Sequence, residues 1–264
     1  MTYYDSHVHS KNSKDGVPSV DAICERAVSM GLGGVAITDH ADVDLGESEL
    51  DVLRALEDDV SAAREKYGGR LEISMGVELG DGNHNQALAE KIVSQESLDF
   101  VIGSIHRQRE RKDYYYLDYE HEDIDDLMRG YYRELRELVR GGCFDVVGHI
   151  NYQIRYMNAA ARARLDLSLY YDILREILED VARAGKGIEI NTSGLWRGVG
   201  FTIPTLEVAR MFRDAGGEII TTGSDSHRAE HVGLKLDGAL ECLKAAGFRR
   251  FAFFKGRKPF FHDI

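Results

Sequence analysis

Residues 3–9 read Tyr3-Tyr4-Asp5-Ser6-His7-Val8-His9, and the rest of the chain is organised around this stretch. The two tyrosines and the residues after them predict the end of a short β-strand. Side chains alternate between the two faces of a strand, so His7 and His9 project from the same face. Two imidazoles held side by side can bind one divalent metal ion. The alternative is a pair of partly buried, hydrogen-bonded histidines, and the remainder of the sequence decides between the two.

The composition limits the class of protein. The chain has 264 residues, 43% of them hydrophobic, which suits one large α/β domain over residues 1–264. Its net charge of −12 makes nucleic acid and anionic membranes poor partners, so an anionic substrate would need local metals or arginines. Three cysteines without paired or metal-type spacing fit a reducing compartment. Because the sequence has no apolar run of about 18 residues and no signal pattern, we expect a soluble cytoplasmic protein.

Segments typical of strands and helices alternate along the whole chain. After the first strand, apolar runs predict strands at 35–38, 71–77, 100–105, 144–148, 187–190, 218–222 and 250–254. Helical periodicity predicts helices at 19–30, 47–66, 85–95, 124–140, 169–184, 204–215 and 233–246, with Pro204 opening its helix. This alternation favours a parallel sheet with helices outside it, closed into a barrel. A doubly wound open sheet is the alternative.

Residues that can bind metals recur at the predicted strand ends. In a (β/α) barrel the carboxyl ends of the strands meet on one face, where active sites are built. Six of the ten histidines and two carboxylates lie at such ends, and Asp15, in the first loop, can add a third carboxylate. The residues at strand ends are His7, His9, His40, Glu78, His106, His149, Asp225 and His227.

These donors favour a hydrolytic metal site. All of them are nitrogen or oxygen ligands without a thiolate, which is untypical of a structural zinc knot. They are too many for a single ion. We therefore expect two or three divalent ions, drawn from zinc, manganese and iron, with a carboxylate bridging a pair of them.

Eight short motifs between residues 5 and 227 form a specific set. They are Asp5-Ser-His7-Val-His9, Ser13-Lys-Asp15-Gly16, Thr38-Asp39-His40, Gly76-Val-Glu78, Gly103-Ser-Ile-His106, Gly148-His149, Asn191-Thr-Ser-Gly194 and Ser224-Asp225-Ser-His227. In these motifs and their order the chain resembles the polymerase and histidinol phosphatase (PHP) superfamily, and most of all its histidinol-phosphate phosphatases.

The resemblance implies a distorted (β/α)7 TIM-like barrel, a single domain, with a trinuclear metal site. A first metal would take His7, His9, Glu78 and Asp225, and a second would share Glu78 and take His106 and His149. A third would take Asp15, His40 and His227. Some relatives have histidine where this chain has Asp15, and the alternative for Asp15 is an aspartate that forms a turn before Gly16.

The expected chemistry is hydrolysis of a phosphomonoester. Paired ions supply hydroxide near neutral pH and clamp a displacement at phosphorus, so we expect a metal-bridging hydroxide to attack. Glu78, Asp225 and His227 are the expected catalytic residues. The guanidinium fork fits phosphate oxygens, which makes Arg155 and Arg197 the expected phosphate ligands. Further candidates for substrate contact are Ser193, Asn191, Arg107 and Arg109.

Other residues near these motifs are expected to support the site or the fold. Tyr114–Tyr116, in the irregular loop 107–123, would form a wall around the organic group or only pack the loop. Asp39, beside His40, would orient a ligand imidazole, and Asp5 would do the same or bond to backbone near the metals. Four histidines lack motif context and are expected to be surface or structural residues: His84, His121, His231 and His262.

The leading functional hypothesis is a histidinol-phosphatase of histidine biosynthesis. The first alternative is a PHP phosphoesterase that acts on a nucleotide, cyclic or sugar phosphate, since the metal ligands would be the same. An amidohydrolase is a weaker alternative, because no lysine lies at a predicted strand end before residue 255. A non-catalytic PHP module is disfavoured by the intact ligand set and the acidic net charge.

Overall fold

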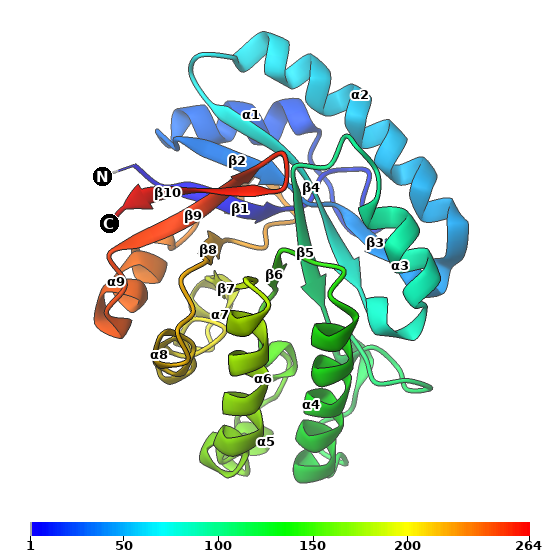
Figure 1. Ribbon diagram of the computed structural model, residues 1–264, viewed down its shortest axis with the longest axis vertical. Helices are drawn as coiled ribbons and strands as arrows, with labels where there is room; N and C mark the ends of the chain where they lie inside the picture. Colours follow the sequence, from blue (N-terminus) through cyan, green and yellow to red (C-terminus); the bar gives the residue numbers. More distant parts are fainter. Residues whose placement is uncertain (1) are drawn as a thin grey trace.

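A parallel sheet forms the centre of the computed structural model, which describes residues 2–264 (Figure 1). Met1, the first residue of the predicted domain, lies outside the described residues. The sheet has eight strands, seven of them in one continuous hydrogen-bonded path. In path order they are β1 (Tyr4–Val8), β2 (Gly34–Ile37), β4 (Glu72–Gly80), β5 (Phe100–Ser104), β6 (Val146–Val147), β7 (Gly187–Asn191) and β8 (Ile220–Gly223).

The first and last strands of this path approach each other and nearly close the barrel. Val8 forms a parallel bridge with Ser226, and the His9 N–H donates to the Ser226 carbonyl at 2.8 Å. The Asp225 N–H donates to the His7 carbonyl, also at 2.8 Å. The predicted (β/α)7 TIM-like barrel is therefore confirmed, and the open doubly wound sheet is wrong.

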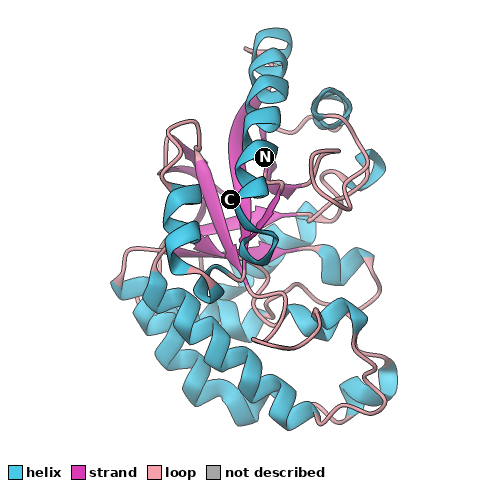
Figure 2. Cartoon of the chain, turned by 90° about the vertical axis from the view of Figure 1, so that its right-hand side faces the viewer, coloured by secondary structure: helices cyan, strands magenta, loops and turns pink. Residues whose placement is uncertain are grey.

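Helices connect the strands and surround the sheet (Figure 2). The start of α1 follows from its sequence, because the Ser19 side chain accepts from the Ala22 N–H at 3.2 Å. The long helix α4 starts in the same way, with the Asp123 carboxylate accepting from two backbone N–H groups. The helices are α1 (Val20–Ser29), α2 (Glu49–Tyr67), α3 (Gln86–Val93), α4 (Ile124–Gly141), α5 (Ala159–Ala163), α6 (Tyr171–Arg183), α7 (Ser193–Trp196), α8 (Leu206–Asp214) and α9 (Leu236–Ala246).

A C-terminal hairpin lies at the amino ends of the barrel strands. It consists of β9 (Arg250–Lys255) and β10 (Lys258–Asp263), which pair antiparallel. Arg257, in its turn, donates to both carboxylate oxygens of Asp145, at 2.6 and 3.0 Å, and to the Val93 carbonyl. The sequence predicted β9 but not β10, whose proline and charged ends hide its strand character.

Three boundaries differ from the predictions in ways that concern the site. Residues after Asp39 form an extra strand, β3 (His40–Asp42), which pairs with the second half of β4. His40 therefore begins a strand instead of ending one, and Glu78 lies inside β4, directly opposite His40. Pro204 does not open a helix, because Ile203 still pairs with Asn191 and α8 begins at Leu206.

The predicted strand 144–148 is only two residues long as β6, although Gly148 still bonds to β5 through its N–H. The segment 151–166, expected to be irregular, contains a 3₁₀ turn (Tyr152–Arg155) and the short helix α5. Across residues 2–264, no helix is both long and apolar enough to cross a membrane.

Candidate metal centre

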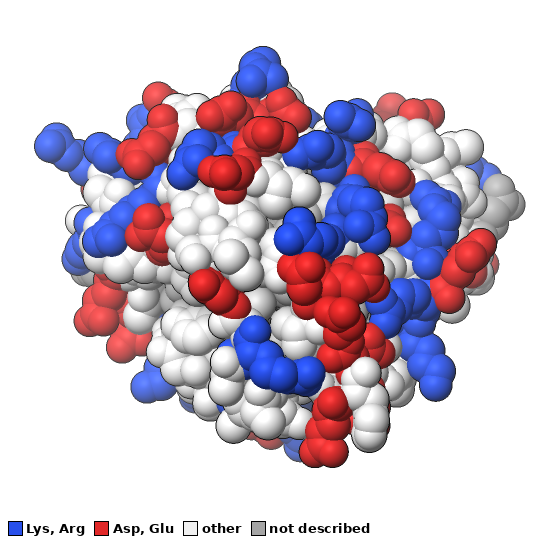
Figure 3. Space-filling model, turned by 90° about the horizontal axis from the view of Figure 1, so that it is seen from below, with Lys and Arg blue, Asp and Glu red and all other residues white. Residues whose placement is uncertain are grey.

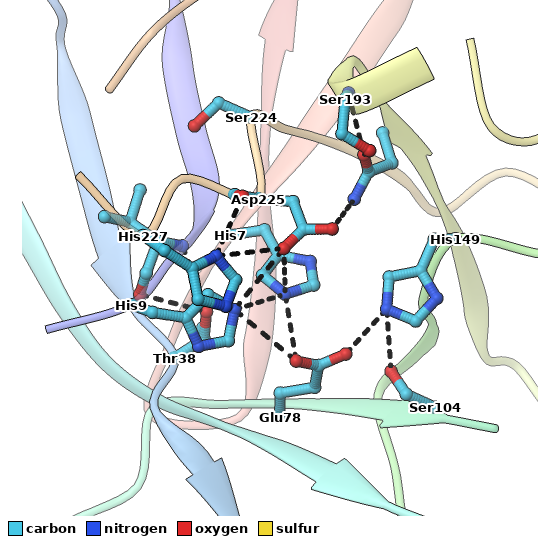
Figure 4. Close-up of polar contacts among 12 residues, drawn as sticks. His7, His9, Thr38, Glu78, Ser104, His149, Ser193, Ser224, Asp225 and His227 are labelled. Atoms are coloured by element: carbon cyan, nitrogen blue, oxygen red, sulfur yellow. Dashed lines mark hydrogen bonds and ion pairs between the residues drawn. The ribbon is translucent and has the colours of Figure 1, made fainter. Parts of the chain in front are cut away.

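The barrel brings the predicted ligand residues together at the carboxyl ends of its strands (Figure 4). His7 lies in β1, His9 follows it, and the other donors lie in or just after β3, β4, β5, β6 and β8. Five overlapping groups of three side chains have ligand atoms within 4.8 Å of one another. Eight of the nine predicted ligands belong to these groups: His7, His9, His40, Glu78, His106, His149, Asp225 and His227.

Glu78 is the centre of the cluster. Its Oε1 lies 2.6 Å from His149 Nε2 and 3.1 Å from His106 Nε2. Its Oε2 lies 3.1 Å from His40 Nδ1, 3.3 Å from His7 Nε2 and 3.4 Å from His9 Nε2. The two oxygens of one buried carboxylate thus face two different sets of imidazoles, which is the geometry a bridging ligand requires.

Asp225 and Asp15 face the cluster from the pocket side. Asp225 Oδ1 lies 3.6 Å from His9 Nε2 and 3.7 Å from His227 Nδ1. Asp225 has a φ of 56°, a conformation uncommon for residues other than glycine and enriched at functional sites. Asp15 is half exposed, and its oxygens lie 3.2 Å from His227 Nε2 and 3.6 Å from His40 Nε2.

Two buried nitrogens show that this donor set fits metal ions. His7 Nε2 and His9 Nε2 lie 3.1 Å apart, and both side chains are fully buried. Because His7 Nδ1 lies 2.7 Å from a carboxylate oxygen of Glu189, which can only accept, the ring hydrogen belongs on Nδ1. In the neutral ring, His7 Nε2 then carries a lone pair directed at its neighbours, as a metal ligand does.

Burial and neighbouring charges shift the pKa values of the cluster in opposite directions. Burial raises the pKa of Glu78, but nearby His7 and His106 outweigh it and hold the pKa well below its usual range. Burial lowers the pKa of His7, yet Glu189 and Glu78 outweigh it and raise the pKa well above 6.5. The metal-free cluster thus pairs ionised Glu78 with protonated His7 and His106, whereas burial lowers the pKa values of His9 and His149. Divalent ions would take the place of the protons.

Glu189 contacts the cluster, although the sequence did not predict it. It lies inside β7, is fully buried, and accepts from His7 Nδ1 through Oε1. Its Oε2 accepts from the His149 backbone N–H at 2.8 Å and from Asn191 at 3.2 Å. The sequence signal that could have identified it is a glutamate inside the apolar strand Gly187–Asn191, because a buried carboxylate must be paired with a partner.

Asp42 was also missed. It lies at the end of the unpredicted β3, and its Oδ1 is 3.5 Å from His106 Nδ1. It forms one of the five ligand groups with His40 and His106. Its Oδ2 is ion-paired with Lys14. Because β3 was not foreseen, nothing in the sequence placed Asp42 beside the cluster.

Two predicted supporting aspartates bond to groups other than ligand imidazoles. Asp39 accepts from the Ser10 backbone N–H and from the Ser10 and Ser13 hydroxyls, and Ser13 Oγ lies 3.2 Å from His9 Nδ1. Asp39 is thus connected through Ser13 to the imidazole of His9, and Ser13 Oγ also accepts from the His40 backbone N–H at 3.0 Å. Asp5 accepts from the backbone N–H groups of Ser224 and Gly233, so it fixes the chain after β8.

The predicted phosphate ligands divide into two groups. Arg155 and Arg197 both line a pocket of about 580 Å³ over the cluster. Arg155 is buried and donates to Ser193 Oγ at 2.9 Å and to Asp225, while its guanidinium lies over the Tyr152 ring. Ser193 is fully buried and lies behind Arg155, outside the pocket lining.

The other candidates lie elsewhere. Arg107 is ion-paired with Asp44 at 2.9 Å, Arg109 lies 3.6 Å from Glu137, and neither lines the pocket. In the tyrosine loop, Tyr114 is buried, whereas Tyr115 and Tyr116 line the pocket. The histidines without motif context lie outside the cluster: His84 pairs with Glu134, His121 with Asp118, His231 contacts Trp196, and His262 stacks on Tyr4.

Known proteins share both the sequence pattern and the fold. The PHP domain family model matches residues 5–193. A probable histidinol-phosphatase of Thermotoga maritima is 27% identical over 94% of each chain. A histidinol-phosphatase of Lactococcus lactis is 26% identical, covering 98% of this chain and 96% of the relative.

Among solved structures, histidinol phosphate phosphatase from Lactococcus lactis, complexed with zinc, L-histidinol and phosphate, superposes with a TM-score of 0.82. That match covers 98% of this chain and 99% of the other at 24% identity, and it establishes the shared fold.

Proposed function

The chain belongs to the PHP domain family, and from that premise we propose that it is a metal-dependent phosphomonoester hydrolase. Its substrate under this proposal is L-histidinol phosphate, which it cleaves to L-histidinol and phosphate in histidine biosynthesis. The alternative is a phosphoesterase of the same family that acts on a nucleotide, cyclic or sugar phosphate.

The convergence of ligand-type side chains around one buried carboxylate carries the proposal. Glu78 lies within 3.4 Å of ring nitrogens from five histidines, at the floor of a pocket that also contains two arginines. A structural metal site would be closed and would not need cationic side chains beside an open pocket. A site that binds a phosphate dianion needs both the cationic side chains and the open pocket.

The resident metals under this proposal are two or three divalent ions of zinc, manganese or iron. His7, His9, Glu78 and Asp225 would hold the first, with Glu78 shared by a second that His106 and His149 complete. A third would lie between Asp15, His40 and His227. When bound, such ions supply a hydroxide near neutral pH and offset the charge that develops on the leaving oxygen.

The chain's own residues would orient the substrate. Arg197 is exposed on the pocket wall and is free to meet phosphate oxygens with its guanidinium fork. Arg155 is held by Ser193, Tyr156 and Asp225, so its position is set before substrate arrives. Glu78, Asp225 and His227 line the pocket and would contact the reacting group through the metals.

The choice of L-histidinol phosphate rests on relatives of nearly equal length. Those from Thermotoga maritima and Lactococcus lactis carry the histidinol-phosphatase name and match this chain almost end to end. A small-molecule partner also agrees with the surface. On the face shown in Figure 3, positive side chains are interspersed with negative ones, without the basic stripe that nucleic acid would require.

Phosphate release from L-histidinol phosphate, beside nucleotide and sugar phosphates, tests the proposal. We expect a strong preference for L-histidinol phosphate that is abolished by chelation and by His9→Ala. His84→Ala is the matched control, because His84 pairs with Glu134 outside the cluster. Preferred turnover of another phosphoester would overturn the substrate, and full turnover by chelated protein would overturn the metal mechanism.

A further inference from the structure

The pocket over the cluster has a second region, formed by loop 107–123 and the turn 152–155. The whole pocket has a volume of about 580 Å³, within the range of small-molecule sites. Its floor consists of the ligand cluster, where the phosphate would lie. Asp113, Tyr115, Tyr116 and Tyr156 also line it; of these, only Tyr156, which accepts from Arg155, has a part in the proposed phosphate site.

Asp113 is a pocket carboxylate with one oxygen that accepts no hydrogen bond from the described protein groups. The other carboxylates of the lining are Asp15, Glu78 and Asp225, all of which face ligand imidazoles. Asp113 uses Oδ1 to accept from the Tyr115 backbone N–H at 2.7 Å. Within residues 2–264, Oδ2 makes neither a hydrogen bond nor an ion pair with any protein group.

Lys14 is a cation close enough to Asp113 to interact with its charge. It lines the same pocket and interacts electrostatically with Asp113, but its ammonium is ion-paired with Asp42. Arg155 and Arg197 also line the pocket, but Arg155 is paired with Asp225, and the Arg197 guanidinium lies over the Trp196 ring and forms no ion pair with Asp113. Asp113 is therefore left with a negative charge that faces the pocket.

The aromatic residues beside Asp113 are unusually exposed. The side chains of Tyr115 and Tyr116 are 59% and 71% exposed, and their rings contact each other at 4.9 Å between centroids. Tyr115 also contacts the edge of Tyr156 at 5.3 Å. Exposed aromatic groups that line a pocket mark a binding surface, and ring faces beside a carboxylate suit a cation.

We propose that Asp113, with Tyr115 and Tyr116, forms a subsite for a cationic group on the alcohol part of the substrate, an ammonium. This inference rests on the proposed function, because it places the phosphate on the metal cluster. The pocket then has a cationic floor for the phosphate and an anionic, aromatic wall for the positive group. The wall selects phosphomonoesters of amino alcohols over those of neutral alcohols.

Paired substrates that differ only in the amine test the subsite. One pair is L-histidinol phosphate and its analogue without the amine, and the second is O-phosphoethanolamine and ethyl phosphate. Asp113→Asn keeps an oxygen to cap the Tyr115 N–H but removes the charge. We expect it to lower the ratio of kcat/KM within each pair by about 10- to 100-fold, as loss of a charged hydrogen bond does.

Asp118→Asn is the matched control, because Asp118 lies in the same loop, pairs with His121 and does not line the pocket. It should leave both ratios unchanged. A wild-type measurement guards against misfolding of the variant: L-histidinol should inhibit more strongly than 3-(imidazol-4-yl)propan-1-ol. Equal inhibition by the two alcohols would overturn the subsite.

The outcomes separate this inference from the proposed function. If L-histidinol phosphate is a poor substrate but the phosphoethanolamine ratio falls in Asp113→Asn, the subsite stands and the proposed substrate fails. If L-histidinol phosphate is preferred and neither ratio changes in the variant, the proposed function stands and the subsite is overturned.

Discussion

Replacing Glu189 with glutamine tests whether a buried carboxylate outside the ligand set controls metal binding. Glu189 Oε1 accepts from His7 Nδ1 at 2.7 Å, and Oε2 accepts from the His149 backbone N–H at 2.8 Å. Glutamine has almost the same shape but only one acceptor oxygen. One of the two hydrogen bonds must therefore be lost.

Both orientations of the glutamine amide have a cost. If its NH₂ faces His7 Nδ1, that nitrogen must accept, and the ring hydrogen moves to Nε2, which then cannot bind a metal. If the NH₂ faces the His149 N–H, two donors oppose each other in a fully buried position. Loss of such an outer-shell partner reduces metal affinity by about 10- to 100-fold, or about 1.4–2.8 kcal/mol.

The assay is competition for zinc against a chelator of known affinity, with bound metal counted after dialysis. Glu189→Gln should lose zinc at a chelator concentration about 10- to 100-fold lower than the wild type. Asp145→Asn is the control, because Asp145 is a buried carboxylate at the opposite end of the barrel, where it pairs with Arg257. It should lower the free energy of unfolding without changing zinc affinity.

Wild-type zinc affinity and full phosphatase activity in Glu189→Gln would refute the reasoning. So would an equal loss of zinc in Asp145→Asn, since the effect would then reflect general destabilisation. A loss of zinc affinity confined to Glu189→Gln would indicate that Glu189 keeps the ring hydrogen of His7 on Nδ1.

Three further predictions follow from single contacts. Arg257→Ala breaks the pair with Asp145 and should lower the free energy of unfolding, measured in urea, by about 2 kcal/mol. This value is near the low end for buried pairs because Arg257 is partly exposed. A change below about 0.5 kcal/mol, typical of surface substitutions, would contradict the prediction. Arg197→Ala should raise the inhibition constant of inorganic phosphate about tenfold, as loss of a charged hydrogen bond does, and no change would remove Arg197 from the phosphate site. Burial lowers the pKa values of His7 and His106, but neighbouring carboxylates outweigh it and raise them well above 6.5, so protons compete with metals from above neutral pH downward. Zinc affinity should therefore fall as pH falls, and zinc binding should release protons. Calorimetry in buffers of different ionisation enthalpy measures that release, and a pH-independent affinity would contradict the assignment.

The positions of most cluster residues could be predicted from the sequence because strand ends are well marked. An apolar run followed by a histidine or carboxylate identifies the top of a barrel strand without any knowledge of packing. This reasoning placed His106, His149 and Asp225 correctly at the ends of β5, β6 and β8. Their mutual contacts then followed from barrel closure.

The parts that could not be predicted depend on pairing between distant segments. The strand β3 exists because His40–Asp42 pairs with the second half of β4, and its three residues carry no pattern of their own. Asp42 therefore stayed hidden. Glu189 was overlooked because a single charge in an apolar strand does not show which partner satisfies it, and that partner, His7, lies in the first strand.

Activity as a function of bound metal tests the central claim most directly. Metal is removed with a chelator, zinc is added back in steps, and phosphate release from L-histidinol phosphate is measured beside the metal content of the same samples. We expect no activity without metal and a return of activity as two or three ions bind per chain. Full phosphate release by a chain that holds no metal would contradict it.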